Sequence, residues 1–187
     1  MSINQIVARQ REYFLSGATR PLEFRMEALK KLRAAITANE QLISDAMKAD
    51  LNKHPMETYM CETGMVLDEL RFHLKHLPQW IKNRPVPTPM AQFHAKSFVA
   101  PEPYGVALIM SPWNYPVQLC LSPLVGAISG GNCAVVKPSA YTPATSAAIA
   151  KLIGDAFDPA YIAVVEGGRQ QNSALLDEKF DYIFFTG

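Results

Sequence analysis

From Tyr104 onward the chain alternates four short apolar runs with three helical segments, and few folds accommodate that order. The runs are "GVALIM", "CAVVK", "YIAVV" and "DYIFF", at 105–110, 133–137, 161–165 and 181–185. Continuous apolar runs of this length are typical of strands buried on both faces of a sheet. Between them, "VQLCLSPLVGAIS", "TPATSAAIAKLIGDAF" and "SALLDEKF" have the character of crossover helices. The pattern predicts an α/β fold with a parallel sheet.

Residues 1–82 show a different pattern, that of helices with one buried face. Apolar side chains recur at helical spacing in two runs, first Leu29, Leu32, Ile36, Ile43 and Met47, then Met60, Leu67, Leu70, Leu74, Leu77 and Ile81. Pro55 separates the runs, and Pro78 is expected to kink the second or to start a new turn. We expect an N-terminal helical segment, 1–82, that packs on the α/β domain, 104–187.

Residues 83–103 link these two parts and are rich in proline. The three prolines of "NRPVPTP" remove backbone donors and fix φ, so we expect no regular structure there. The following "AQFHAKSFVAPEPYG" is typical of an irregular edge strand. The whole segment is therefore predicted to be an extended connector.

Charge and cysteine content narrow the range of partners and locations. The net charge is +1 without a basic stripe, which gives no indication of a nucleic acid partner. No apolar stretch reaches the roughly 18 residues of a membrane span, and no signal-peptide core is present. Three widely spaced cysteines without a CxxC pair favour a reducing, cytoplasmic location. His73 and His76 lack a third metal ligand at helical spacing, so a solvated helix surface is favoured over a metal site.

Polar or small residues follow each predicted strand at its carboxyl end, where open parallel sheets bind ligands. These are, strand by strand, Asn114, Lys137, the pair Gly167 and Gly168, and the pair Thr186 and Gly187. An amide, an ammonium and small glycines suit a cofactor with phosphate and ribose groups beside a polarised carbonyl. Each of these residues, taken alone, is also common in an ordinary turn. No strand is followed by GxGxxG, the usual dinucleotide-binding motif. The pattern by itself indicates an α/β nucleotide-type domain.

Three segments taken together carry a more specific resemblance. "PYGVALIMSPWNYP", "GAISGGNCAVVKPS" and "FTG", at their mutual spacing, resemble the N-terminal part of the aldehyde dehydrogenase superfamily, with its Rossmann-like cofactor domain. The likeness covers nearly the whole chain, and "LPQWIKNRPV" makes it most similar to the class 3 group. The resemblance implies NAD(P)-dependent oxidation of an aldehyde to a carboxylic acid through a thiohemiacetal and an acyl-enzyme. It also implies a homodimer for the full-length protein.

The resemblance implies roles for individual residues. Asn114 matches the family asparagine that donates its side-chain N–H to the aldehyde oxygen, and Tyr115 and Gln118 are expected to line the substrate channel. Lys137 matches the lysine that binds the adenosine ribose of the cofactor. The expected cofactor-binding residues are Met110, Ser111, Pro112, Trp113, Lys137, Ser139, Ala140, Gly167, Gly168, Thr186 and Gly187.

The sequence departs from the family pattern in two ways. Ala140 stands where many members carry a glutamate that binds the ribose hydroxyls and disfavours a 2′-phosphate, so we expect use of NADP as well as NAD. The family's nucleophilic cysteine and general-base glutamate lie beyond the "FTG" turn, and Cys61, Cys120 and Cys133 are each expected to be inert buried thiols. We therefore expect an N-terminal fragment without the catalytic domain, inactive by itself.

Two alternatives remain open. One is another enzyme on the same scaffold, such as a semialdehyde or acyl-phosphate reductase or a CoA-acylating dehydrogenase. The other is a non-catalytic module that binds a nucleotide or a protein partner. A cysteine and a glutamate at the family spacing after Gly187 would favour the aldehyde-oxidising enzyme over both.

Overall fold

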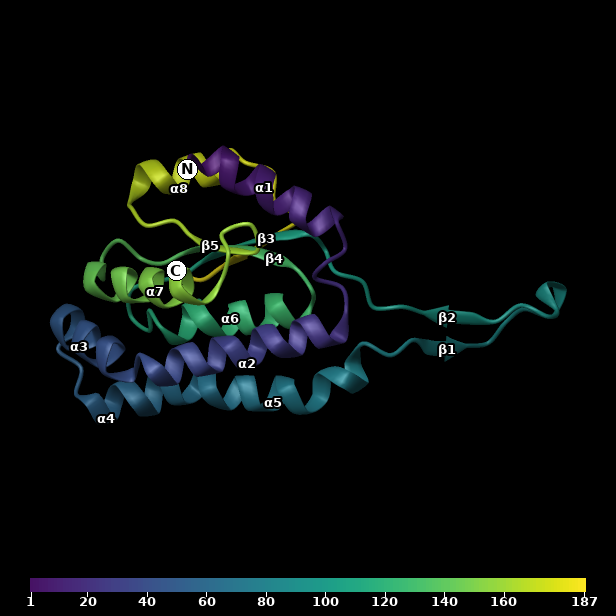
Figure 1. Ribbon diagram of the computed structural model, residues 1–187, viewed down its shortest axis with the longest axis horizontal. Helices are drawn as coiled ribbons and strands as arrows, with labels where there is room; N and C mark the ends of the chain where they lie inside the picture. The colour runs from purple at the N-terminus through teal and green to yellow at the C-terminus, as the bar shows by residue number, and fades with distance from the viewer.

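A four-stranded parallel sheet organises the molecule (Figure 1). The computed structural model describes residues 1–187, and the strand order is β5-β4-β3-β6. The strands are β3 (Val106–Met110), β4 (Cys133–Lys137), β5 (Ile162–Val164) and β6 (Tyr182–Phe185). Every residue of β3 and β4 is buried, whereas β6 lies at an edge and leaves Tyr182, Ile183 and Phe185 exposed. The predicted α/β fold with a parallel, Rossmann-like sheet is confirmed.

Helices cover both faces of this sheet (Figure 1). On one face lie α6 (Gln118–Ser129) and α7 (Pro143–Ala156), which connect β3 to β4 and β4 to β5. On the other face lie α1 (Ile3–Leu15) and α8 (Arg169–Leu176), which leads into β6. The chain moves outward from β3 to β5 and then returns to the other side of β3, so its direction across the sheet reverses. Ligands of open α/β sheets bind at the strand ends beside such a reversal.

The other N-terminal helices form a further layer on α6 and α7. They are α2 (Leu22–Ala38), α3 (Glu40–Leu51), α4 (Pro55–Thr58) and α5 (Gly64–Trp80), with a π-helical turn, Tyr59–Thr63, joining the last two. Helix α2 packs on α6 and α7, α3 on α7, and α5 on α6. The first predicted apolar stripe is confirmed, because its five members are at most 1% exposed: Leu29, Leu32, Ile36, Ile43 and Met47.

The second stripe contains one error. Leu70 and Leu77 are buried as predicted, but Met60 is 64% exposed. Met60 lies in the π-helical turn, whose extra residue shifts the helix face by one position relative to an ideal α-helix. A strict helical spacing therefore places Met60 on the wrong face.

The core has two parts, one on each face of the sheet. The larger contains 27 buried residues between the sheet and the helices α2, α3, α5, α6 and α7. The smaller contains six residues, Val7, Leu108, Met110, Val135, Val165 and Leu175. Along Leu108–Met110 of β3 the side chains alternate between the two parts, since Ile109 belongs to the larger and Leu108 and Met110 belong to the smaller. This alternation explains why the strand reads as a continuous apolar run.

A carboxylate of the N-terminal segment caps a helix of the sheet layer. Asp50 accepts hydrogen bonds from the backbone N–H groups of Ala144 and Thr145 at 3.2 and 2.7 Å, at the start of α7. Thr142 occupies the N-cap position of α7, but the Asp50 carboxylate replaces its hydroxyl as the acceptor. Negative charge is favourable at a helix N-terminus, so this contact stabilises the packing of the N-terminal helices on the sheet layer.

The segment 83–103 contains one strand where none was expected, in "NRPVPTP", and one in the part where an irregular edge strand was expected. Strand β1 (Arg84–Val86) pairs antiparallel with β2 (Ser97–Val99), with Pro85 opposite Phe98. The short helix η2 (Met90–Gln92) lies in the turn between them. Both strands of a two-stranded ribbon are edge strands, where a proline is tolerated because one side of the strand needs no partner. The ribbon projects from the body of the molecule (Figure 1).

The histidines also depart in part from the prediction. His73 is not a solvated surface residue, because its Nδ1 lies 2.6 Å from Ser129 Oγ and its Nε2 lies 3.0 Å from Glu69 Oε1. Its imidazole therefore joins α5 to the end of α6. The structure contains no group of three side chains able to hold a metal ion. None of its helices has the length and apolar character needed to cross a bilayer.

Candidate functional site

The carboxyl ends of the strands bring together residues that are distant in the sequence. In the parallel register, Met110 pairs with Lys137 of β4 and with Phe185 of β6. The pairing continues one residue further, where the N–H of Ser111 donates to the carbonyl of Lys137 at 3.2 Å. The N–H of Thr186 likewise donates to the carbonyl of Met110 at 3.1 Å. The segments that follow β3, β4 and β6 therefore start side by side.

A cavity of about 440 Å³ lies at this edge, between the strand ends and the start of α8. Several of the residues predicted to bind a cofactor line it, namely Met110, Ser111, Lys137, Ser139, Ala140 and Gly168. The other lining residues were not predicted from the sequence, namely Tyr141, Arg169, Asn172 and Phe185. This volume falls in the range typical of small-molecule and cofactor sites.

Three polar side chains of the cavity have unused hydrogen-bonding capacity. Ser111 Oγ and Asn172 Oδ1 are buried and have no hydrogen-bond partner in the protein, a state that native proteins rarely leave unexplained. Lys137 is 3% exposed, and its Nζ donates one hydrogen bond, 2.6 Å long, to the carbonyl of Pro138. An ammonium carries three donors, so two remain for a ligand. Such a set fits the hydroxyl and phosphate oxygens of a nucleotide.

The Lys137 ammonium is held in an environment that disfavours its charge. Burial lowers the pKa of Lys137 below its ordinary value of 10.5, and Cys120 and Glu166 nearby oppose that effect. A ligand oxygen that accepts a hydrogen bond from Nζ would stabilise the charged form. The site is therefore better satisfied with a polar ligand bound than without one.

The residues that the sequence did not indicate come mostly from the first turn of α8. Gly168 is the N-cap of this helix, and Arg169 and Asn172 lie three residues apart, on neighbouring parts of one helix face. A signal was present in the sequence, because Arg169 directly follows the Gly-Gly turn after a strand and Asn172 lies three residues further along the same helix. Helix N-termini at this edge commonly face the ligand, and that rule applied to α8 finds both residues.

The other predicted cofactor-binding residues, Pro112, Trp113, Gly167, Thr186 and Gly187, are not part of the cavity wall. Gly167 shapes the turn before α8, since its φ is +125° and a Cβ there would lie 2.5 Å from the Gln171 side chain. Gln171 Oε1 in turn accepts a hydrogen bond from the N–H of Gly168 at 3.1 Å. Trp113 is 53% exposed.

Asn114 follows β3 on the loop that leads into α6, and it is exposed. Its side-chain amide makes no hydrogen bond, whereas its backbone carbonyl accepts one from Lys53 Nζ at 3.0 Å. Tyr115 is 43% exposed and Gln118 is half-buried. The amide is therefore free to donate to an oxygen that approaches from outside.

The three cysteines differ from one another in exposure. Cys120 and Cys133 are fully buried, and burial raises the pKa of each thiol to about 12. A thiol with such a pKa is protonated at neutral pH and is a poor nucleophile. Cys61 is only half-buried, which corrects the prediction of a buried thiol, because it lies on the π-helical turn at the surface of the helical layer.

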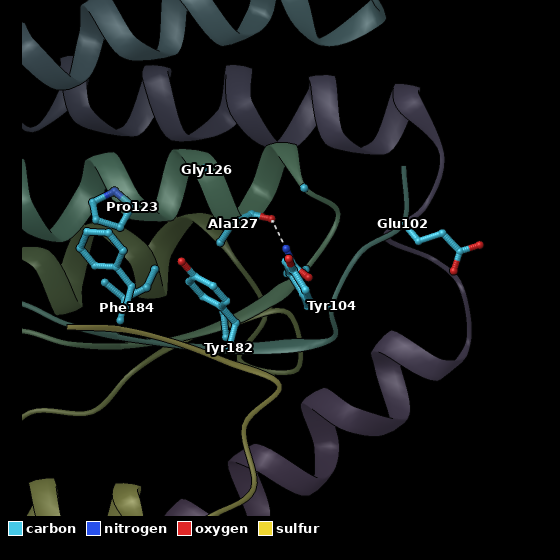
Figure 2. Close-up of a pocket in the computed structure, with 11 residues that line it drawn as sticks. Glu102, Tyr104, Pro123, Gly126, Ala127, Tyr182 and Phe184 are labelled. Atoms are coloured by element: carbon cyan, nitrogen blue, oxygen red, sulfur yellow. Dashed lines mark hydrogen bonds between the residues drawn. The ribbon is translucent and has the colours of Figure 1, made fainter. Parts of the chain in front are cut away.

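A second cavity, of about 340 Å³, lies on the face of the sheet between α6 and β6 (Figure 2). Tyr182 and Phe184 point into it from β6, opposite Pro123 and Ala127 of α6. Its one carboxylate, Glu102, is exposed at the margin. The cavity holds none of the residues predicted for the site, and it lacks a buried cation or a free amide. The strand-end cavity is therefore the better candidate for chemistry.

Comparison with known proteins decides the family. The profile of the aldehyde dehydrogenase family matches residues 1–187. The chain belongs to the aldehyde dehydrogenase family. It is 42% identical over 185 residues to the 4,4′-diaponeurosporen-aldehyde dehydrogenase of Staphylococcus aureus, and 40% identical over 185 residues to human aldehyde dehydrogenase family 3 member B1. The resemblance predicted from the "PWNYP" and "KPS" segments is confirmed, including the likeness to the class 3 group.

Each alignment covers 99% of this aldehyde dehydrogenase chain, and the chain spans about 40% of the length of each of these relatives. A solved structure, the substrate-bound state of Staphylococcus aureus AldH, superposes with a TM-score of 0.96 at 41% identity, over 99% of this chain and 40% of that one. PnpE from Pseudomonas sp. WBC-3 superposes with a TM-score of 0.80 at 21% identity, over 95% of this chain and 36% of that one, which shows the fold alone.

Proposed function

We propose that the full-length protein oxidises an aldehyde to a carboxylic acid with NAD or NADP. The observation that carries the proposal is the strand-end cavity, in which Lys137, Ser111 and Asn172 have unused hydrogen-bonding capacity. The free amide of Asn114 follows three residues after Ser111 on the same loop. The donor proposed for the substrate thus lies on the loop that starts at the wall of the cavity proposed for the cofactor.

The lining residues fit a dinucleotide, and each has a definite part in the proposal. Lys137 Nζ and the unpartnered oxygens of Ser111 and Asn172 would hold the ribose and phosphate groups, with Ser139 and Gly168 beside them. When bound, the nicotinamide supplies the hydride acceptor for the oxidation. The protein's own contribution here is to bind and orient the cofactor, because the wall offers hydrogen-bond donors and acceptors and contains no cysteine.

Asn114 is proposed to act on the aldehyde itself. When a thiolate attacks the carbonyl carbon, the carbonyl oxygen gains negative charge, and a donor already in place stabilises that charge. None of the three cysteines suits the role of that thiolate, since two are buried with raised pKa values and Cys61 lies on the helical layer. We propose that a catalytic domain of the full-length protein supplies the thiolate and the general base.

Formation of reduced cofactor by the purified full-length protein, with a panel of aliphatic and aromatic aldehydes, tests this function. We expect aldehyde-dependent reduction of NAD or NADP with one carboxylate formed per reduced cofactor. The 187-residue chain alone is the matched control and is expected to be inactive, because it holds no suitable thiolate. Activity of the short chain, or none from the full-length protein with any aldehyde, would contradict the proposal.

We further propose that both NAD and NADP are used, and that Arg169 favours the 2′-phosphate of NADP. Ala140 and Arg169 both line the cavity. Its wall therefore has a guanidinium, and it has a methyl group at the position where the family resemblance leads one to expect a glutamate. Arg169→Gln is expected to lower kcat/KM with NADP about tenfold or more and to change kcat/KM with NAD less than about twofold, since a charged hydrogen bond contributes about 1.5–3 kcal/mol. Arg169→Lys is the control that keeps the charge. Turnover with NADP below about 1% of that with NAD would contradict this use of both cofactors.

A homodimeric full-length protein is also proposed. The ribbon of β1 and β2 projects from the body and carries exposed apolar side chains, namely Val86, Met90, Phe93, Phe98 and Val99. Exposed apolar side chains gathered on a projecting edge are typical of interaction surfaces.

All three cysteines are free, which supports the proposed reducing, cytoplasmic location.

A further inference from the structure

A buried ion pair of the N-terminal segment lies directly beneath the Asn114 loop. Lys53 directly follows Asn52, the C-cap of α3 with a left-handed φ of 55°, and Glu62 belongs to the π-helical turn before α5. Lys53 Nζ lies 2.6 Å from Glu62 Oε1, and the two side chains are 11% and 0% exposed. Charges are rarely buried this deeply without a specific set of partners.

Each member of the pair holds a different end of the loop. Lys53 Nζ donates to the carbonyl of Asn114 at 3.0 Å and lies 4.3 Å from the centre of the Tyr115 ring. Glu62 Oε2 accepts hydrogen bonds from the backbone N–H groups of Val117 and Gln118, at 3.0 and 2.8 Å. One ion pair therefore binds the loop where it presents the amide and again where it enters α6.

The loop has little else to hold Asn114 in place. The bond from Lys53 is the one hydrogen bond that Asn114 makes, and Trp113, Asn114 and Tyr115 are all exposed. Rotation of the backbone at Asn114 would move its side-chain amide with it. Misplacement of a catalytic donor by about 1 Å can cost about 100-fold in rate, so the position of this carbonyl matters.

We propose that Lys53, held by Glu62, is a positioning residue for the Asn114 amide. The inference rests on the proposed aldehyde oxidation and assigns to the N-terminal helical segment a part in that reaction. A π-helical turn within a helix is often found at a functional site, which agrees with the place of Glu62.

The double variant K53M/E62Q, made in the full-length protein, removes this contact with little disturbance elsewhere. Glu62 receives both backbone bonds on one oxygen, so the glutamine carbonyl can keep them, and methionine keeps the length of the Lys53 side chain. Neither substitution leaves a buried charge unpaired. The matched control is K151M/D155N, which removes an exposed pair on α7.

We expect K53M/E62Q to lower kcat/KM for the aldehyde by about 10–100-fold and to leave the dissociation constant of NAD or NADP within about twofold of the wild type. The control double variant should leave both unchanged. K53R, which keeps a cation in reach of both partners, should recover most of the activity. In an N114A background the pair variant should cause no further loss, because it acts through Asn114.

Three results would overturn the proposal. The first is an unchanged kcat/KM in K53M/E62Q, and the second is a loss of kcat/KM in the N114A background as large as in the wild-type background. The third is loss of cofactor binding, which would show that the pair supports the fold as a whole. An inactive wild-type enzyme would instead refute the proposed function, so the two failures are distinguishable.

Discussion

Replacement of Asn114 with alanine in the full-length protein is expected to lower kcat by about 10²–10³-fold, the largest effect of any single substitution in this chain. Loss of one preorganised donor to a developing oxyanion has a cost of this size in other enzymes. The free side-chain amide of Asn114, on a loop at the carboxyl end of β3, is the structural basis for the expectation. Steady-state kinetics with a saturating cofactor measures it.

The pattern of the loss distinguishes catalysis from folding. Asn114→Ala should leave the affinity for NAD or NADP and the thermal midpoint close to those of the wild type, since the side chain is exposed and unbonded. Asn83→Ala, at another exposed asparagine, is the matched control and should behave as the wild type. A kcat within about threefold of the wild type would exclude Asn114 as the oxyanion donor.

Lys137→Met is expected to raise the dissociation constant of NAD and NADP by about 10–100-fold. The prediction follows from the loss of charge-assisted hydrogen bonds from Nζ, each about 1.5–3 kcal/mol. Quenching of tryptophan fluorescence on cofactor binding measures the constant. Lys179→Met, at an exposed lysine, is the control.

The same substitution should not destabilise the protein in the absence of cofactor. Burial lowers the pKa of Lys137, so the folded state binds this proton less tightly than the unfolded state does. The free energy of unfolding is therefore reduced at neutral pH. This reduction disappears as the pH rises through the pKa of Lys137 in the folded state toward 10.5. Methionine removes the cost, so the thermal midpoint should be equal to or above that of the wild type. Weaker folding together with unchanged cofactor binding would mark Lys137 as a structural residue.

The fold was predictable because its signals are local. Continuous apolar runs mark the central strands, and the stripe from Leu29 to Met47 marks the buried face of α2 and α3. The topology of a parallel sheet then places Lys137 and Ser111 at one edge without any knowledge of distances. The pairing of β1 with β2 was missed because Pro85 in β1 and the two prolines after it suppress the local signal, although a ribbon of edge strands tolerates a proline.

The site was predictable only in part, because some of its contacts are non-local. Arg169 and Asn172 line the cavity from the first turn of α8, which the position of the helix N-terminus indicates but the spacing within the helix does not. Lys53 reaches Asn114 across 61 positions of sequence, through a left-handed turn and a π-helical turn that a regular helical pattern does not contain. Such contacts depend on how the layers pack.

A crystal structure of the full-length protein with bound NAD is the decisive test of the proposed cofactor site. We expect the adenosine ribose within hydrogen-bonding distance of Lys137 Nζ, in the cavity between the ends of β3 and β4 and the start of α8. We also expect the Asn114 amide to face the reactive end of the cofactor. Cofactor bound instead in the apolar cavity between α6 and β6, or anywhere away from Lys137, would contradict it.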